Sequence, residues 1–445
     1  MVTEKTMTSP HRASTLLILL AASTALAQPV NPALMKYACG PANRMFATLS
    51  PTTVYAEMRA GFDLNTMPDF KGNSCSSAKP FFFSVPIAEG SYRVTLVLGG
   101  PQAATTTVKA EARRLMLEKI ATKPDESVTH TFDVNVRFPE FDLPDGTSGR
   151  VHLKPREIGN LDWDSKLTLE FNGDHPSIRS ISIEPIEKSS HEPTIYLAGD
   201  STVVDQDIEP WAAWGQMLPR FFTAGVVVAN HAESGETIKS FVGEQRFAKI
   251  FSLIQPGDYL FMQFNHNDQK PGAVSLDDYK RLFTEYIAKT RAAGATPVLV
   301  TAMHRNTFDA AGHITNSLGD YPEAVRQIAA EQHVALIDLN GMSKTLFEAL
   351  GPEATMHAFM HYPANAYPNQ PDPINDNTHF NAYGAYELAR CIVHGIRQAN
   401  LPLTKYLSPD VPDFNPTHPD PQSTFHLPET PTTPTQTNPM KIPQT

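Results

Sequence analysis

The sequence contains only three cysteines, Cys39, Cys75 and Cys391. At most one disulfide can form within the chain, so this is not a small disulfide-stapled protein. Cys39 and Cys75 lie in one region and could pair in an oxidising compartment, whereas Cys391 lies in a helical pattern and is expected to be a buried free thiol. Zinc-site spacing is also lacking. His357 and His361 are four residues apart, but neither an adjacent glutamate nor a third ligand accompanies them.

Basic residues are also fewer than acidic ones. There are 36 Lys and Arg against 47 Asp and Glu, a formal net charge of −11. Nucleic-acid binding needs clustered Lys and Arg, so nucleic acid is not expected as a partner. The apolar run at residues 14–27, STLLILLAASTALA, is shorter than the roughly 20 residues that a membrane-spanning helix needs. A membrane is therefore not expected as a partner either.

This apolar run instead has the features of a secretory signal. Lys5 and Arg12 precede it, and it ends in Ala-Leu-Ala at residues 25–27, a small-x-small cleavage pattern. We therefore expect a signal peptide over residues 1–27 and a secreted or periplasmic mature protein.

The region from residue 30 to residue 187 has the pattern of an antiparallel β-sandwich. The segments TFDVNVRF (131–138) and KLTLEFNG (166–173) alternate apolar and polar residues, as half-buried strands do. Turn residues separate many such short runs, which is typical of a sandwich. The polar segment EKSSHEP (187–193) then predicts a domain boundary.

Beyond this boundary the pattern changes to α/β. Apolar runs such as TIYLAG (194–199) and DYLFMQF (258–264) alternate with helical segments. Strands that are apolar throughout are buried on both faces, as in a parallel sheet between two layers of helices. The fold class predicted for residues 194–405 is therefore a three-layer α/β/α domain. Residues 409–445 are rich in Pro and Thr and are predicted to be a disordered tail.

Four polar segments follow or flank the predicted strands. They are GDST (199–202), ANHAESGET (229–237), FNHNDQK (264–270) and NDNTHF (375–380). Each has an ordinary interpretation as a helix cap or a polar turn. In a parallel sheet, however, ligands bind at the carboxyl ends of the strands, so these segments can meet at one site. The chain contains no G-x-S-x-G sequence, which disfavours the common α/β-hydrolase arrangement.

Together the four segments contain every group that acyl transfer needs. Ser201 would be the nucleophile, His379 the base that takes its proton, and Asp376 the carboxylate that orients the imidazole. The backbone N–H groups of Ser201 and Gly235 and the side-chain amide of Asn267 would form the oxyanion hole. Hydrolysis by such a triad requires no metal and no cofactor, and none is expected.

These four segments, in this order, resemble the SGNH (GDSL-like) hydrolase superfamily, whose signature residues map onto Ser201, Gly235, Asn267 and His379, with Asp376 completing the triad. The longer segments YLAGDSTV, WGQMLP, NHAESGETIKSF and DNTHFNAYGAYELA are more narrowly similar to rhamnogalacturonan acetylesterases. This resemblance covers about residues 194–400. The preceding region, with EGSYRVTLVLGG and FDVNVR, resembles the galactose-binding-like β-sandwich of two-domain members.

The sequence departs from the family pattern in two places. The third block has Asn265 where the family usually has glycine, and the second block has Glu233 and Glu236 flanking Gly235 rather than a Gly-Gly-Arg-Ser type. The second change removes a cation and adds two carboxylates beside the site. These carboxylates disfavour an acidic sugar as the substrate, but they do not bear on the prediction of ester hydrolysis.

Two further residues are candidates for substrate binding. His304 and Arg305 follow the fourth predicted strand at the same sheet edge, where they could contact sugar hydroxyls or a uronate. A structural ion pair is an equally good interpretation.

The leading hypothesis is a secreted serine esterase that removes acetyl groups from a plant polysaccharide or its oligosaccharides, above all pectin, and acts as a monomer. A first alternative is an esterase of the same mechanism with another substrate, such as acetylated xylan or a lipid, although no apolar lid segment is evident. A second alternative is a carbohydrate-binding protein without catalysis. The presence of both Ser201 and His379 disfavours that alternative.

Overall fold

The computed structural model of the chain describes residues 1–2, 35–41, 44–143, 145–187, 192–368 and 370–432. The predicted signal peptide, apart from its first two residues, and the last part of the predicted tail lie outside these residues.

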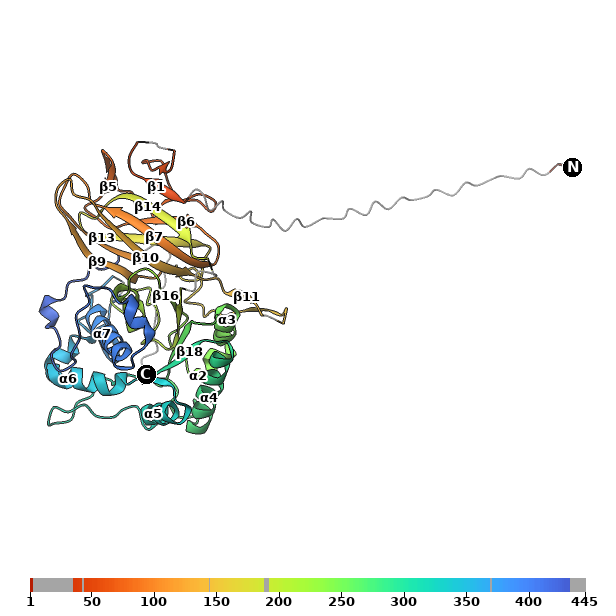
Figure 1. Ribbon diagram of the computed structural model, residues 1–445, viewed down its shortest axis with the longest axis vertical. Helices are drawn as coiled ribbons and strands as arrows, with labels where there is room; N and C mark the ends of the chain where they lie inside the picture. The colour runs from red at the N-terminus through yellow and green to blue at the C-terminus, as the bar shows by residue number, and fades with distance from the viewer. Residues whose placement is uncertain (3–34, 42–43, 144, 188–191, 369, 433–445) are drawn as a thin grey trace.

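Two largely antiparallel sheets form the first half of the molecule (Figure 1). One sheet has the order β10-β7-β14-β1-β2, with β5 pairing with β14 and β4 with β5, and the other has the order β3-β6-β13-β8-β9. The strands of the first sheet are β1 (Lys36–Ala38), β2 (Ala47–Thr48), β4 (Asp69–Lys71), β5 (Ser74–Ser76), β7 (Gly90–Leu98), β10 (Val128–Val136) and β14 (Ser177–Pro185). Those of the second are β3 (Gly61–Asp63), β6 (Phe81–Pro86), β8 (Ala104–Ala110), β9 (Arg114–Thr122) and β13 (Lys166–Asp174). A separate hairpin consists of β11 (Glu140–Asp142) and β12 (Ser148–Arg150).

The core of this β domain follows from the alternation of its strands. Along β7, Val94, Leu96 and Leu98 are fully buried, while the residues between them are partly exposed. Leu167 and Phe171 of β13, from the other sheet, belong to the same apolar cluster. Side chains of period two thus fill the space between two sheets, as in a sandwich. A disulfide between Cys39 and Cys75 links β5 to the segment after β1.

A five-stranded parallel sheet forms the centre of the second half, in the order β16-β15-β17-β18-β19. Its strands are β15 (Thr194–Gly199), β16 (Val227–Asn230), β17 (Tyr259–Gln263), β18 (Thr296–Val300) and β19 (Ala335–Ile337). The helices are α1 (Trp214–Met217), α2 (Ile238–Gly243), α3 (Arg246–Leu253), α4 (Leu276–Ala292), α5 (Tyr321–Gln332), α6 (Leu339–Met356) and α7 (Ala382–Gln398). The remaining elements are the short 3₁₀ helices η3 (Leu218–Phe221), η4 (Pro402–Tyr406) and η5 (Gln422–Thr424) and the hairpin of β20 (Phe359–Tyr362) and β21 (Ile374–Phe380).

Helices cover both faces of the parallel sheet, which confirms the predicted three-layer α/β arrangement. Ile195 and Leu197 of β15 pack into the core formed with α1, α6 and α7. Tyr196 and Ala198 point the other way, into the core formed with α2 to α5. Figure 1 shows α6 and α7 on one side of β18 and α2, α3 and α4 on the other.

The sandwich and the α/β domain share buried contacts. Leu115 of β9 belongs to the apolar core of the α/β domain. Beside it, the buried Arg114 forms an ion pair with the buried Asp205 at 3.1 Å. Arg113 donates hydrogen bonds to the carbonyl oxygens of Gln206 and Trp211, at 3.1 and 2.9 Å. The sandwich therefore holds the segment that follows β15.

The prediction of a disordered tail is wrong for residues 409–432. Phe414 is buried, and the guanidinium of Arg390 lies 4.2 Å from the centre of its ring. Further along, the carbonyl of Pro428 accepts a hydrogen bond from Lys109 of the sandwich at 2.7 Å. A Pro-rich segment forms few hydrogen bonds within itself, because proline lacks an N–H donor. Here side chains of both domains contact the segment instead. The remaining tail, residues 433–445, lies outside the described residues.

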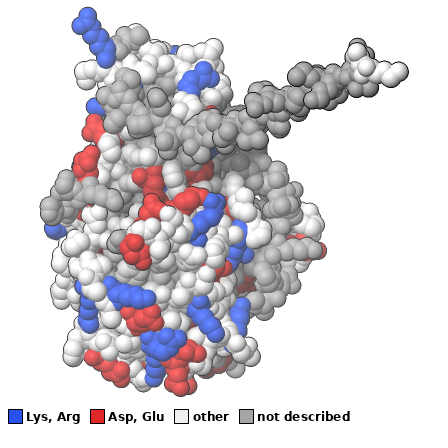
Figure 2. Space-filling model, turned by 90° about the vertical axis from the view of Figure 1, so that its right-hand side faces the viewer, with Lys and Arg blue, Asp and Glu red and all other residues white. Residues whose placement is uncertain are grey.

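Charges of both signs are interspersed on the surface that Figure 2 shows. Ion pairs along α4 follow the same mixed pattern, with Arg281 3.3 Å from Asp278 and Lys289 2.7 Å from Glu285. The net negative charge therefore does not form one continuous acidic area on that face. Among the described residues, no helix is both long enough and apolar enough to cross a membrane.

Candidate active site

The predicted site residues lie at the carboxyl edge of the parallel sheet. Ser201 follows β15, Gly235 follows β16 and Asn267 follows β17. β15 lies between β16 and β17, and the helices that follow β15 and β17, α1 and α4, lie on opposite faces of the sheet, which creates the crevice where ligands bind in such sheets. Asp376 and His379 lie in β21, which pairs with β20 and leads into α7.

Ser201, His379 and Asp376 form a continuous chain of hydrogen bonds. The hydroxyl oxygen of Ser201 is 2.8 Å from Nε2 of His379, and Nδ1 of His379 is 2.6 Å from Oδ2 of Asp376. A proton on Nδ1 donated to the carboxylate leaves Nε2 as the acceptor for the serine hydroxyl. The arrangement can therefore generate a serine nucleophile.

The surroundings of Asp376 favour its ionised form. Burial raises its pKa, but hydrogen bonds from the His379 ring and from the backbone N–H groups of Thr378 and His379 outweigh burial and lower the pKa to about 2. The carboxylate thus remains charged at neutral pH, where it can stabilise an imidazolium on His379.

Asp376→Asn should therefore lower kcat for an aryl acetate by about 10⁴-fold, because an amide cannot hold the imidazole in the required tautomer. Circular dichroism and the thermal midpoint, measured in parallel, should show that the fold persists. A fall of less than tenfold in a folded variant would contradict the role given to Asp376.

Three hydrogen-bond donors are available for an oxyanion. Within the described part of the chain, no hydrogen bond is donated by the backbone N–H of Ser201 or of Gly235. Gly235 has a φ of +79°, in the left-handed region that favours glycine, and it is exposed. The amide of Asn267 donates one hydrogen to the carbonyl of Glu236 at 2.9 Å, which leaves its second hydrogen free.

His304 and Arg305 both make internal contacts. His304 is 6% exposed, its backbone N–H donates to Ser343, and burial lowers its pKa to about 4. The guanidinium of Arg305 donates to Thr378 at 3.0 Å and to the carbonyl of His266 at 3.2 Å. Arg305 thus braces the loop after β17 against β21, and substrate contact by either residue stays a prediction.

Asn265, the unusual residue of the third block, is fully buried. The side chain that Asn265 adds in place of glycine therefore lies in the protein interior.

Two functional candidates were missed from the sequence. Lys154 and Arg156, in the segment of the sandwich between β12 and β13, contact the loop that contains Gly235. Arg156 pairs with Glu233 at 2.5 Å, and Lys154 pairs with Glu236. Two carboxylates beside Gly235, the predicted oxyanion-hole glycine, were the available signal, since buried carboxylates require cationic partners.

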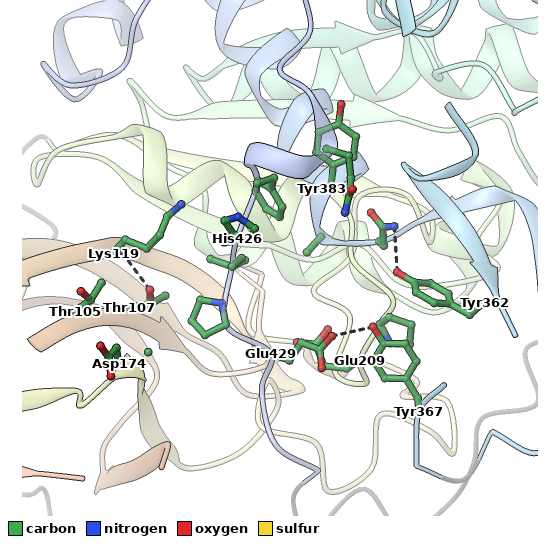
Figure 3. A pocket seen from close by; sticks show the side chains of 18 residues that line it. Thr105, Thr107, Lys119, Asp174, Glu209, Tyr362, Tyr367, Tyr383, His426 and Glu429 are labelled. Carbon is green, nitrogen blue, oxygen red and sulfur yellow. Dashed lines mark hydrogen bonds between the residues drawn. The ribbon is translucent and has the colours of Figure 1, made fainter. Parts of the chain in front are cut away.

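A separate hollow lies between the sandwich, β20 and the segment around residue 426 (Figure 3). Its volume is about 600 Å³, and Ser201 and His379 do not line it. Glu429 and Tyr367 meet in it at 2.8 Å, as do Tyr362 and Asn381 at 3.1 Å. This hollow is therefore separate from the serine–histidine–aspartate chain.

Comparison with known proteins adds family membership to this geometry. Residues 197–386 match the GDSL-like Lipase/Acylhydrolase family. Rhamnogalacturonan acetylesterase RhgT of Bacillus subtilis (strain 168) is 44% identical over 216 residues, which are 48% of this chain and 93% of that protein. The probable rhamnogalacturonan acetylesterase YesY of the same organism is 38% identical over 217 residues, 47% of this chain and 95% of its own. The chain belongs to the GDSL-like (SGNH) hydrolases.

As an SGNH hydrolase resembling rhamnogalacturonan acetylesterases, the chain is a serine esterase. The matched segment 197–386 contains both Ser201 and His379 and leaves out the sandwich. Among solved structures, protein YxiM from Bacillus subtilis aligns with 82% of this chain and 99% of its own, with 23% identity and a TM-score of 0.46.

Proposed function

We propose that the protein is a secreted enzyme that removes O-acetyl groups from pectic polysaccharide, specifically rhamnogalacturonan, through an acetyl-enzyme on Ser201. The observation that carries the proposal is the hydrogen-bonded chain from Ser201 through His379 to Asp376, at 2.8 and 2.6 Å. It lies at the edge of the sheet where SGNH hydrolases have their signature segments. In the proposed mechanism, side-chain and backbone groups of the chain, together with a water molecule, supply every step of this reaction.

Acylation begins when the Ser201 oxygen attacks the acetyl carbonyl carbon and its proton moves to Nε2 of His379. The negative charge that develops on the carbonyl oxygen is stabilised by the N–H groups of Ser201 and Gly235 and the amide of Asn267. The ester C–O bond to the sugar then breaks, and the sugar oxygen receives the proton from His379. The products of this half-reaction are the free sugar hydroxyl and acetyl-Ser201.

Deacylation repeats these steps with water. His379 takes a proton from a water molecule, whose oxygen attacks the acetyl carbon of acetyl-Ser201. The bond to the serine oxygen breaks, the proton returns to that oxygen, and acetate leaves. Asp376 stays ionised throughout and balances the positive charge that His379 carries twice in each cycle.

One observation supports rhamnogalacturonan as the substrate, and a second removes an objection to it. RhgT and YesY, the relatives at 44% and 38% identity, have rhamnogalacturonan acetylesterase in their names. In addition, Glu233 and Glu236, which would repel an acidic sugar if unpaired, are matched by Arg156 and Lys154. Pairing cancels much of the repulsion that their charges would exert on a galacturonate.

Export and a sandwich of the galactose-binding-like type complete the proposal. The charged-apolar-small pattern of residues 1–27 supports a signal peptide. The disulfide between Cys39 and Cys75 is of the kind that persists in oxidising compartments, outside the cytosol. The sandwich strands and the two-domain pattern of the sequence support the galactose-binding-like assignment.

Acetate release from acetylated rhamnogalacturonan, acetylated xylan and an aryl acetate tests the substrate. We expect kcat/KM to be at least about tenfold higher on rhamnogalacturonan than on xylan, a difference of about 1.4 kcal/mol in transition-state binding. Equal or higher activity on xylan would keep the esterase mechanism and reject the substrate. No release from any of the three by folded protein would reject the esterase.

A further inference from the structure

We propose that Lys154 and Arg156 of the sandwich are positioning residues for the oxyanion hole of the esterase domain. They bind the carbonyl oxygen of Ser234 and thereby hold and polarise the peptide group whose N–H, that of Gly235, receives the oxyanion. The inference rests on the proposed function, because it assumes that Gly235 is an oxyanion donor.

The geometry of one peptide group links the cations to the donor. Lys154 Nζ donates to the carbonyl oxygen of Ser234 at 2.8 Å, and Arg156 Nη2 donates to the same oxygen. This carbonyl and the N–H of Gly235 belong to one planar trans peptide, so the N–H points away from the oxygen. Two cations on the oxygen therefore fix the plane of the peptide and the direction of the N–H.

The same contacts strengthen the donor. Hydrogen bonds to a carbonyl oxygen draw electron density from the amide nitrogen, which makes the N–H a better donor, and charged donors do so more than neutral ones. A Cβ placed on Gly235 would lie 3.9 Å from both Nη2 of Arg156 and Nζ of Lys154. Both positive charges therefore lie close to Gly235.

A second predicted donor depends on the same segment. The side-chain amide of Asn267 donates to the carbonyl of Glu236 at 2.9 Å. The carboxylate of Glu236 is in turn bound by Lys154 and accepts from Ser240 at 2.5 Å. Lys154 thus stabilises the residue that orients Asn267, so the sandwich influences two of the three donors.

The cationic segment is itself firmly attached to the esterase domain. Glu157 accepts the backbone N–H of Lys154 at 2.8 Å and pairs with the buried Arg246 at 2.6 Å. Trp163 packs edge-on against His231 at the start of the Gly235 loop, with ring centres 5.8 Å apart. Such anchoring reduces the freedom of two long side chains, which is what a positioning role requires.

Steady-state kinetics of Lys154→Ala/Arg156→Ala, each single variant and Arg156→Lys test the proposal on an aryl acetate and on acetylated rhamnogalacturonan. We expect kcat of the double variant to fall about 10- to 100-fold on both substrates, with KM changed less than threefold. Arg156→Lys, which keeps the positive charge, should lower kcat less than Arg156→Ala does. The matched control is Arg150→Ala, an exposed cation of the same domain paired with Glu140.

Inhibition by phenylboronic acid provides a readout that a purely structural role would not change. Its tetrahedral serine adduct places an oxygen in the oxyanion hole, so Ki should rise by the same factor by which kcat/KM falls. If the double variant does not fold, Lys154→Gln and Arg156→Gln replace it, each checked by its thermal midpoint.

Two results would overturn the inference. One is wild-type kcat and Ki in folded variants that lack the cations. The other is a higher KM on rhamnogalacturonan with aryl acetate hydrolysis unchanged, which would make the cations substrate ligands instead. Failure of the proposed function is distinguishable from both, because then the wild-type protein itself would release no acetate or would hydrolyse acetylated xylan at least as well as acetylated rhamnogalacturonan.

Discussion

Ser201→Ala is expected to lower kcat for an aryl acetate by about 10⁶-fold. The hydroxyl oxygen lies 2.8 Å from His379 Nε2, and no other nucleophile takes its place in the proposed mechanism. Ser201 is 6% exposed, so a methyl group in place of the hydroxymethyl leaves packing nearly unchanged and the thermal midpoint should shift little. Initial-rate assays with an aryl acetate and with acetylated rhamnogalacturonan measure the effect.

Two comparisons make this result specific. Thr202→Val removes a hydroxyl from the next residue, which binds Asp200 at 2.7 Å, and should cost far less activity than Ser201→Ala. The double variant Ser201→Ala/His379→Ala should be no slower than Ser201→Ala alone, because the two groups act as one unit. Retention of more than a hundredth of wild-type activity by folded Ser201→Ala would remove Ser201 as nucleophile.

Removal of the sandwich should disable the esterase domain. A chain that begins at residue 192 loses Leu115 from its apolar core and leaves Asp205 without Arg114. It also leaves Glu233 and Glu236 without Arg156 and Lys154. Loss of one partner of a buried pair costs about 3–5 kcal/mol, and a whole domain is stable by only about 5–15 kcal/mol. We expect aggregation or a molten state, detected by size-exclusion chromatography and near-ultraviolet circular dichroism.

The control for this truncation is a chain that begins at residue 35 and keeps the sandwich, which should be folded and active. An isolated 192–445 fragment that is monomeric, melts cooperatively and hydrolyses aryl acetate at the full rate would contradict the account. In that event the sandwich would be an appended module, with effects confined to polymeric substrate.

The α/β fold and the meeting of the site segments could be predicted because both follow from local patterns. Apolar strands alternating with helices imply a parallel sheet, and the carboxyl ends of its strands share one edge. Ser201 and His379 are 178 positions apart, yet this rule brings their segments together. The pairing of β21 with β20 could not be predicted, because NDNTHF has the composition of a loop.

Contacts between domains were beyond prediction for a different reason. The approach of Lys154 and Arg156 to the Gly235 loop depends on how two independently patterned domains dock, and no local periodicity encodes that. The order of residues 409–432 was missed because composition reports whether a segment can build its own core. It does not report whether side chains such as Lys109 will bind the segment's carbonyl groups.

Trapping the acetyl group is the most direct test of the central claim, that Ser201 carries it during turnover. Wild-type protein is mixed with acetylated rhamnogalacturonan oligosaccharides, quenched in acid during the first turnovers and analysed by peptide mass spectrometry. The account predicts an acetyl group on Ser201, absent without substrate and absent in His379→Ala. Acetate release with no acetyl group on Ser201, or with acetyl on another residue whose loss abolishes activity, would contradict it.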